Sequence, residues 1–501
     1  MTSTPDSRPS ATLLLRLRSA PDGADVYPVD ITLDGEGSLT AQATVPADAL
    51  TACESSPWEY GRRLGDALFA DAGLRRALAY ARGLAPRVSL CLQVDAPSLQ
   101  DLLWERLILV DGGQETVLAT DSRVALSRRI PSETPALPPG RGAFSLLLVL
   151  SSPVELQRTP EGSLQPLDVS AEVSALREAW TPLVERGQLR VTILGRLEEA
   201  LAASLRQAGY DVDSEPATLD AIVDRLDSVD SLHLIAHGTF KNGRATLLLE
   251  NVEGGAAATP EDAFVSRLGH DTLRLVFLQA CKSAARQPGA LNVMSGLAPK
   301  LTGRAAGVVA MQDFVRMEDA RRFAQAFYDA LLRSGNADEA ANAGRRAIYR
   351  PDSGNWAIPA VYLAPKATCL WQPDPVLKAI HELAKKFKGR SDAKHPFPIE
   401  AIRQWPDISS KMETSPPGPR VRIRDAVDAA LCPPQGEGSA IVVITGNHGR
   451  AKTAQLQALY VHHAGQLQRD SDRLPFYVHL SAIPAGDEAL EEVLAEGIAL
   501  T

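Results

Sequence analysis

Residues 274–284 read RLVFLQACKSA, an apolar run that turns abruptly polar at Cys281 and Lys282. A short continuous apolar run is typical of a strand that is buried on both faces. Such strands occur in parallel sheets covered by helices, where sites form just beyond the carboxyl ends of the strands. We therefore predict a buried parallel strand that delivers Cys281 to the rim of a sheet.

The surrounding sequence alternates between apolar runs and amphipathic segments. Strand-like runs occur at residues 143–153, 189–194, 231–238, 273–280 and 305–312. Helical spacing of apolar residues occurs at 169–187, 197–210, 218–228, from about 291 onward, and at 317–335. Strands that alternate with helices predict an α/β fold, with a mostly parallel sheet covered by helices at residues 143–366.

The rest of the chain divides into five further parts. The polar residues 1–10 predict a flexible tail. Strand-like runs at 11–20 and 87–96 flank a helical pattern at 57–83, so residues 11–130 predict a small mixed α and β subdomain. The stretch 131–142 is rich in proline and glycine and suits a linker. Residues 367–430 predict a helical and proline-containing linker, and residues 431–501 a further domain.

Composition narrows the class of protein. The chain has 501 residues and a formal net charge of −9, which predicts two to four domains and no nucleic-acid partner. It contains no apolar run of about 18 residues, so we expect no membrane insertion. The five cysteines form no CxxC pair, which argues against a disulfide framework or a metal site and fits a reducing cytoplasm.

A histidine follows the neighbouring strand-like run. His237 and Gly238 come directly after an apolar stretch, as Cys281 does. Adjacent parallel strands would bring both ends to one rim, where the imidazole would activate the thiol as a nucleophile. The N–H groups of Gly238 and Cys281 would then bind the oxyanion of a tetrahedral intermediate. This pattern predicts a catalytic pair.

A structural interpretation competes with the catalytic one. A cysteine on an apolar strand is usually part of the core, and a lone histidine is usually a buried polar group with a partner. His233 lies inside the apolar run, four residues before His237, and we interpret it as structural. The position of both His237 and Cys281 after a strand, beside small residues, favours catalysis for that pair.

The two motifs together resemble a known family. QAC with a histidine about 50 residues upstream is a caspase signature, although the stretch here is QACKS. The closer resemblance is to CHAT domains, caspase-like cysteine peptidases related to separase. It covers residues 90–365 and is carried by LWERL, HLIAHGTF, VFLQACKSA, GLAPKLTGRAAGVVAMQ, FAQAFYDALL and NWAIPAVYL. The resemblance implies a caspase-like sheet, His237 as base, Cys281 as nucleophile, and peptide cleavage without a metal or other cofactor. The alternative is a catalytically inactive adaptor or scaffold.

The resemblance also implies where substrate binds. In related peptidases the region that corresponds to residues 311–315 contacts the substrate, so Gln279, Gln312 and Asp313 are candidate pocket residues. Asp313 would favour a basic residue before the cleaved bond. The alternative is that Asp313 is an ordinary acid in a loop or before a helix.

A second motif follows the strand-like run 440–445. The sequence GNHGRAKT fits the P-loop pattern at Gly446, Lys452 and Thr453 and contains Gly449, but Ala451 replaces the second required glycine. The segment resembles the start of a NACHT or related STAND NTPase, and we expect the domain to be incomplete.

This second resemblance implies a regulatory role. A complete domain of this kind would bind ATP with magnesium, and it would control or oligomerise the peptidase in defence or cell death. The implied substrate is a partner protein, for example a cell-death effector such as a bacterial gasdermin. For the chain itself we expect weak ATP binding or none, because Ala451 crowds the phosphate loop.

Overall fold

The structure is a computed structural model in which the chain divides into two compact units. The first unit comprises residues 1–184 and 188–373, and the second comprises 185–187 and 374–501. The structure describes residues 10–20, 25–131, 137–154, 158–159, 162–163, 167–185, 187–241, 244–268, 273–280, 293–313, 315–351, 353–365, 367, 369–372, 407–409, 420–422, 457 and 459–460.

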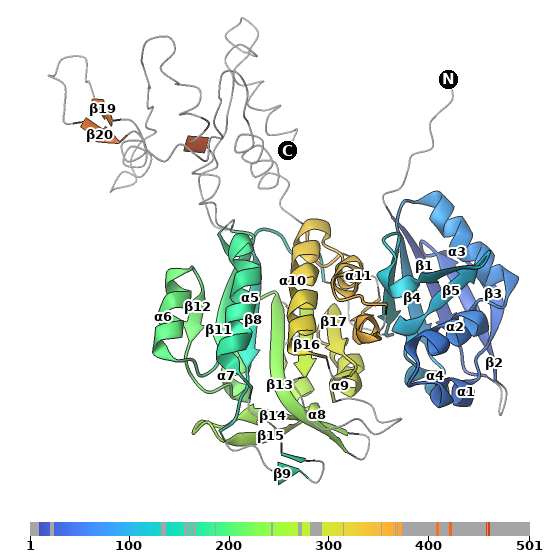
Figure 1. The fold of residues 1–501 in the computed structure, drawn as a ribbon, viewed down its shortest axis with the longest axis horizontal. Coiled ribbons are helices and arrows are strands. Elements are labelled where there is room, and N and C mark those ends of the chain that lie inside the picture. The colour runs from blue at the N-terminus through green and yellow to red at the C-terminus, as the bar shows by residue number, and fades with distance from the viewer. Residues whose placement is uncertain are drawn as a thin grey trace, which may run out of the picture. The chain divides into compact units, whose positions relative to one another are not determined.

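One large sheet forms the centre of the first unit (Figure 1). Within the described residues it has 14 strands, of which 12 follow the order β12-β11-β8-β13-β16-β17-β18-β7-β4-β1-β2-β3. The strands of the carboxyl-terminal half are β8 (Phe144–Leu150), β11 (Leu189–Leu194), β12 (Asp211–Asp213), β13 (Ser231–Lys241), β16 (Leu275–Ala280), β17 (Gly307–Met311) and β18 (Pro359–Leu363). All of these neighbours pair in parallel except β17 and β18, which are antiparallel. The predicted mostly parallel α/β fold is confirmed.

Helices cover both faces of this half of the sheet. They are α5 (Val169–Val184), α6 (Glu199–Gln207), α7 (Leu219–Leu226), α8 (Glu261–Arg267), α9 (Val293–Leu301), α10 (Met317–Ser334) and α11 (Ala337–Ala347). Alternate strand residues enter different cores: Phe277 packs in the cluster that contains residues of α5 and α10, and Val276 in the one that contains residues of α7 and α9. Figure 1 shows α5 and α10 side by side across the near face. Burial on both faces explains the continuous apolar runs.

The amino-terminal half continues the same sheet. Its strands are β1 (Ala11–Leu17), β2 (Val26–Leu33), β3 (Glu36–Thr44), β4 (Val88–Val94) and β7 (Val124–Arg129), beside a small hairpin of β5 (Ile108–Asp111) and β6 (Gln114–Val117). Its helices are α1 (Ala47–Ala52), α2 (Pro57–Leu68), α3 (Ala72–Leu84) and α4 (Pro97–Gln100), with short 3-10 helices η1 (Trp104–Arg106) and η2 (Leu118–Thr120). The two halves join where β7 pairs with β18, at Arg128 with Tyr362 and Arg129 with Leu363. The amino-terminal half is thus the mixed α and β structure that the sequence predicts, built onto the edge of the core sheet.

The remaining elements are short. A 3-10 helix, η3 (Asn355–Ala357), precedes β18, and β9 (Arg158–Thr159) pairs with β10 (Gly162–Ser163). In the second unit, β19 (Asp407–Ser409) pairs with β20 (Arg420–Arg422). The predicted phosphate-loop residues lie outside the described residues: Gly446, Gly449, Ala451, Lys452 and Thr453.

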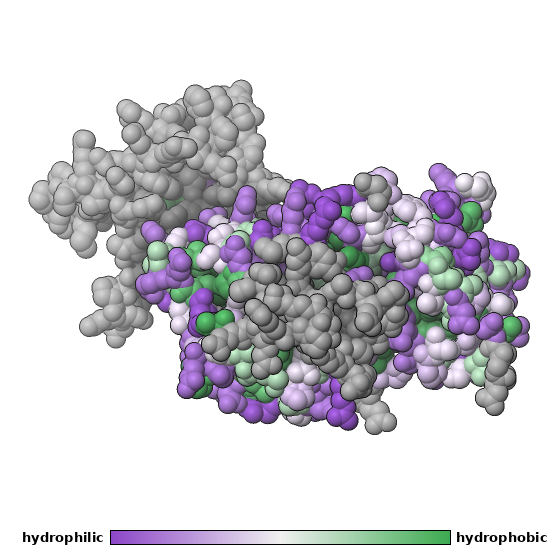
Figure 2. Space-filling model, turned by 60° about the horizontal axis from the view of Figure 1, so that its bottom comes forward, coloured by the Kyte–Doolittle hydropathy of each residue, from purple (hydrophilic) through white to green (hydrophobic). Residues whose placement is uncertain are grey.

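Figure 2 shows hydrophilic and hydrophobic residues intermingled over the coloured part of the face in view. Among the described residues, every helix is too short or too polar to cross a bilayer.

Candidate active site

The register between β13 and β16 aligns the two predicted catalytic positions. The strands pair in parallel from Ser231 with Leu275 through Ala236 with Ala280. His237 follows Ala236 in the sequence, and Cys281 follows Ala280. Cys281 itself lies outside the described residues. The residues that directly precede the predicted base and nucleophile are therefore partners on neighbouring strands.

His237 lies where β13 leaves the parallel sheet. The pairing of β13 with β8 ends at Ile235, and its pairing with β16 ends at Ala236. From His237 onward β13 pairs instead with β14 (Arg244–Glu250), in an antiparallel hairpin that places His237 opposite Leu248. A further strand, β15 (Ala256–Pro260), pairs with β14. The imidazole of His237 is 1% exposed, so it lies in a protected position at the rim of the sheet.

His233 has a different environment, on the same strand. Its ring stacks on Phe277 with 4.2 Å between ring centroids, and its Nδ1 lies 3.3 Å from the hydroxyl of Tyr328. It is fully buried, and burial lowers the pKa of His233 to about 3. A neutral imidazole packed between aromatic rings has a structural role, as the sequence interpretation proposes.

A buried carboxylate orders the loops beside His237. Glu250, at the end of β14, accepts hydrogen bonds from the backbone N–H of Ser152 at 3.2 Å and of Ala217 at 2.9 Å. Arg196 donates to the same carboxylate at 2.9 Å. Ser151, the residue after β8, donates from its own N–H to the carbonyl of Ile235 at 3.0 Å. Sequence reasoning missed Glu250, because nothing local shows that a glutamate after LLL is buried.

The segment after β17 forms the other flank of the rim. Gln312 directly follows β17 and is 6% exposed. Its side-chain amide donates to Glu105 Oε2 at 2.7 Å and accepts from Arg128 Nη2 at 2.8 Å. Asp313, the next residue, is partly buried, and Gln279 on β16 is 2% exposed. Substrate contact by Gln279, Gln312 and Asp313 stays a prediction.

The partner of Gln312 is a buried ion pair in the amino-terminal half. Arg128 donates to Glu105 Oε1 at 2.9 Å from Nε and to Oε2 at 2.5 Å from Nη2. Burial alone would raise the pKa of Glu105, but the Arg128 guanidinium more than offsets it, so the pKa lies below its usual value. The pair is therefore charged, and it is fully enclosed in protein.

The three cysteines that the structure describes are poor candidates for a nucleophile. Cys53 and Cys91 are buried, and Cys369 is partly exposed. Burial raises the pKa of the Cys91 and Cys369 thiols, which disfavours the reactive thiolate. Cys432 lies outside the described residues. The described part of the chain has no group of three or more His, Cys, Asp or Glu side chains placed to hold a metal ion.

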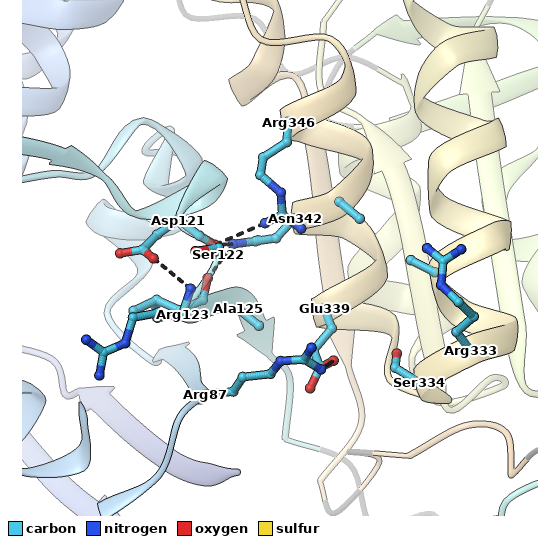
Figure 3. Close-up of a pocket in the computed structure, with 13 residues that line it drawn as sticks. Arg87, Asp121, Ser122, Arg123, Ala125, Arg333, Ser334, Glu339, Asn342 and Arg346 are labelled. Carbon is cyan, nitrogen blue, oxygen red and sulfur yellow. Dashed lines mark hydrogen bonds and ion pairs between the residues drawn. The ribbon is translucent and has the colours of Figure 1, made fainter. Parts of the chain in front are cut away.

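A cavity of about 350 Å³ lies elsewhere in the first unit, among α10, α11 and the start of β7 (Figure 3). Arg87 pairs with Glu339 across it at 2.7 Å. Asn342 on α11 donates to the carbonyls of Leu118 at 3.2 Å and Asp121 at 3.3 Å, so this wall belongs to the joint between the two halves. The cavity shares no lining residue with the ends of β13, β16 or β17, and we do not assign it to the candidate active site.

The fold and the rim geometry define an α/β protein with a mostly parallel sheet and a histidine at the end of a parallel strand. Residues 58–397 match the family model described as "CHAT domain". The chain belongs to the CHAT domain family, which has a cysteine-peptidase-type fold. No curated protein matches the chain.

Two solved structures of the Saccharomyces cerevisiae separase–securin complex are also similar to the chain. The sequence identities are 11% and 12%, and the TM-score is 0.30 in both comparisons. Each match covers 58% of this chain but only 17% or 16% of the matched chain. The family assignment rests on the family model and not on this distant likeness.

Proposed function

We propose that the chain is a cysteine endopeptidase that uses His237 as base and Cys281 as nucleophile. The register of β13 with β16 is the observation that carries this proposal, because Ala236 and Ala280 are partners and directly precede the two residues. Family membership supports it, since the CHAT fold is of the cysteine-peptidase type. His237 also lies beyond the last pairing of β13 with both parallel neighbours.

The reaction follows the chemistry of activated thiols. His237 takes the thiol proton of Cys281, and the thiolate sulfur bonds to the carbonyl carbon of the cleaved peptide. The N–H groups of Gly238 and Cys281 stabilise the resulting oxyanion. The imidazolium then gives its proton to the leaving amine as the C–N bond breaks. Water hydrolyses the thioester, and the thiol is restored.

The finer parts of the proposal concern substrate and control. Asp313 is partly buried beside the rim, so its charge favours a basic residue before the cleaved bond. The substrate is a protein, and a cell-death effector such as a bacterial gasdermin fits a role in defence. The P-loop-like segment at residues 446–453 regulates the peptidase within a larger NTPase that binds ATP with magnesium.

Labelling by a peptide electrophile tests the catalytic assignment. Wild-type protein and Cys91→Ala, which removes a buried thiol, should be labelled equally. Cys281→Ala and His237→Ala should each lose about a thousandfold or more in rate, and the double variant should be little worse than either one. Full labelling of Cys281→Ala would refute the assignment. Absence of labelling in the wild type would favour the inactive adaptor.

A further inference from the structure

The end of β17 lies at the same rim as the predicted catalytic residues. In the parallel register of β16 with β17, Leu278 pairs with Ala310. Ala280 and Gln312 each come two residues later, so both strands reach the rim at the same level. Since β13 lies on the other side of β16, Gln312 flanks the end of β16 opposite His237. The rim is thus built from three adjacent strand ends.

Gln312 is fixed from two directions. Its backbone N–H donates to the carbonyl of Ile358 at 2.9 Å, which belongs to the core half. Its side chain instead crosses to the amino-terminal half and meets Glu105 and Arg128. Arg128 is itself held by the carbonyls of Gln100 at 3.3 Å and Leu102 at 3.1 Å. Gln312 therefore links the rim of the sheet to the amino-terminal half through its side-chain hydrogen bonds.

Stability alone is a weak explanation for this arrangement. Glu105 is 0% exposed and Arg128 is 7% exposed, so both charges have lost nearly all contact with water. Buried ion pairs can often be replaced by apolar residues at no cost in stability, because desolvation offsets the attraction. A bidentate pair that also holds an amide does, however, fix direction and distance closely. The hydrogen bonds from Glu105 and Arg128 therefore hold the side chain of Gln312 in one position.

We propose that Glu105 and Arg128 are positioning residues that act through Gln312 to set the conformation of residues 312–313 for binding an extended peptide substrate. This inference rests on the proposed peptidase function. It makes the amino-terminal half a working part of the active site, although its own residues make no contact with the reacting atoms. The effect should therefore fall on substrate binding and leave the reactivity of the Cys281 thiolate unchanged.

Two electrophiles separate these effects in the full chain. Iodoacetamide reports the reactivity of Cys281 without peptide contacts, with Cys281→Ala as background. A peptide chloromethyl ketone with arginine before the reactive carbon reports both the inhibition constant KI and the inactivation rate. For Glu105→Gln and Gln312→Ala we expect KI to rise about tenfold or more, because small displacements of a positioned group are costly. In Glu105→Gln the iodoacetamide rate should stay within about twofold of the wild-type rate, since the nucleophile is untouched.

Asp230→Asn is the matched control. Asp230 is a buried carboxylate that pairs with Arg274 at 2.9 Å, at the amino ends of the same strands. Its loss should lower stability without changing KI. Arg128→Lys, which keeps the charge but not the two-pronged contact, should raise KI less than Gln312→Ala.

The outcomes are distinct. An unreactive Cys281 in the wild type would refute the proposed function, and this inference with it. A reactive Cys281 with unchanged KI in folded Glu105→Gln and Gln312→Ala would refute the positioning role alone. The positioning role would equally be refuted if Asp230→Asn raised KI as much as Gln312→Ala does, because the effect would then be one of general stability.

Discussion

His233 should make the protein lose stability on mild acidification. The imidazole is fully buried against Phe277, and burial lowers the pKa of His233 from 6.5 to about 3. In the unfolded chain the same group takes up a proton near its ordinary pKa. Because the unfolded state then binds a proton that the native state does not, stability is full above pH 6.5. It falls as the pH drops from there toward 3.

The size of the effect follows from the difference in pKa. Each pH unit below the ordinary pKa costs about 1.4 kcal/mol, so at pH 5 the loss from His233 is about 2 kcal/mol. His233→Phe keeps a ring against Phe277 and removes the titrating group, and His233→Asn removes it in a smaller side chain. Neither variant should lose the stability that the protonation of His233 costs the wild-type protein at pH 5.

Urea unfolding at pH 7.5 and at pH 5 measures the prediction. For each protein the change between the two pH values is compared, so that the packing cost of the substitution cancels. Wild-type protein should lose about 2 kcal/mol more than either variant over this interval. Equal losses in all three proteins would refute the reasoning that His233 is held neutral by burial.

Four further predictions address packing, charge, specificity and nucleotide binding. A Cβ at Gly65 would lie 1.8 Å from a backbone carbonyl oxygen of β5, so Gly65→Ala should lower the free energy of unfolding by about 2 kcal/mol or more. Gly83→Ala has open space around it and should instead raise it by up to about 1 kcal/mol; the opposite order in thermal or urea unfolding would contradict this. Burial raises the pKa of Asp338 to about 6, so its charge costs stability that returns as the pH falls through 6. Asp338→Asn should therefore exceed the wild type in stability at pH 7.5 and lose about half of that advantage by pH 5, because the change runs from pH 6 down to the ordinary pKa of 3.8, and a constant gap would count against it. Asp313→Asn should weaken the preference for a basic over an acidic residue before the cleaved bond about tenfold or more in a peptide library. An unchanged preference would show that Asp313 does not set it. Calorimetry of the full chain should detect no micromolar ATP binding, because Ala451 stands where the P-loop pattern requires its second glycine, and clear binding would show that the alanine is tolerated.

The core strands could be predicted because burial on both faces leaves a local signature. All seven residues of β8, for example, are buried, and all except Ser145 are apolar. The positions at the rim of the sheet could be predicted from the same apolar runs, since each run ends at a polar side chain. The signature places His237 just after a buried run, and in the structure the parallel pairings of β13 end just before it.

Other features depend on contacts that no local pattern records. The helix α11 is rich in alanine and has almost no large apolar residue, yet Asn342 and Arg345 on it are buried and hydrogen-bonded to β7. The β14–β15 hairpin was also missed, although its strand β14 is the partner of β13 from His237 onward. The ion pair between Glu105 on η1 and Arg128 on β7 was not predicted either. The partners of Asn342 and Arg345 on β7 lie 216 and 219 residues away in the chain.

The pairing of β7 with β18 has a consequence for any shortened form of this protein. If the chain were cut to begin at residue 143, β18 would keep β17 but lose β7, and its backbone groups at Tyr362 and Leu363 would lose their partners. All five residues of β18 are buried in the intact protein. An uncovered, apolar strand edge invites pairing with a second molecule. The carboxyl-terminal half by itself should therefore self-associate or precipitate.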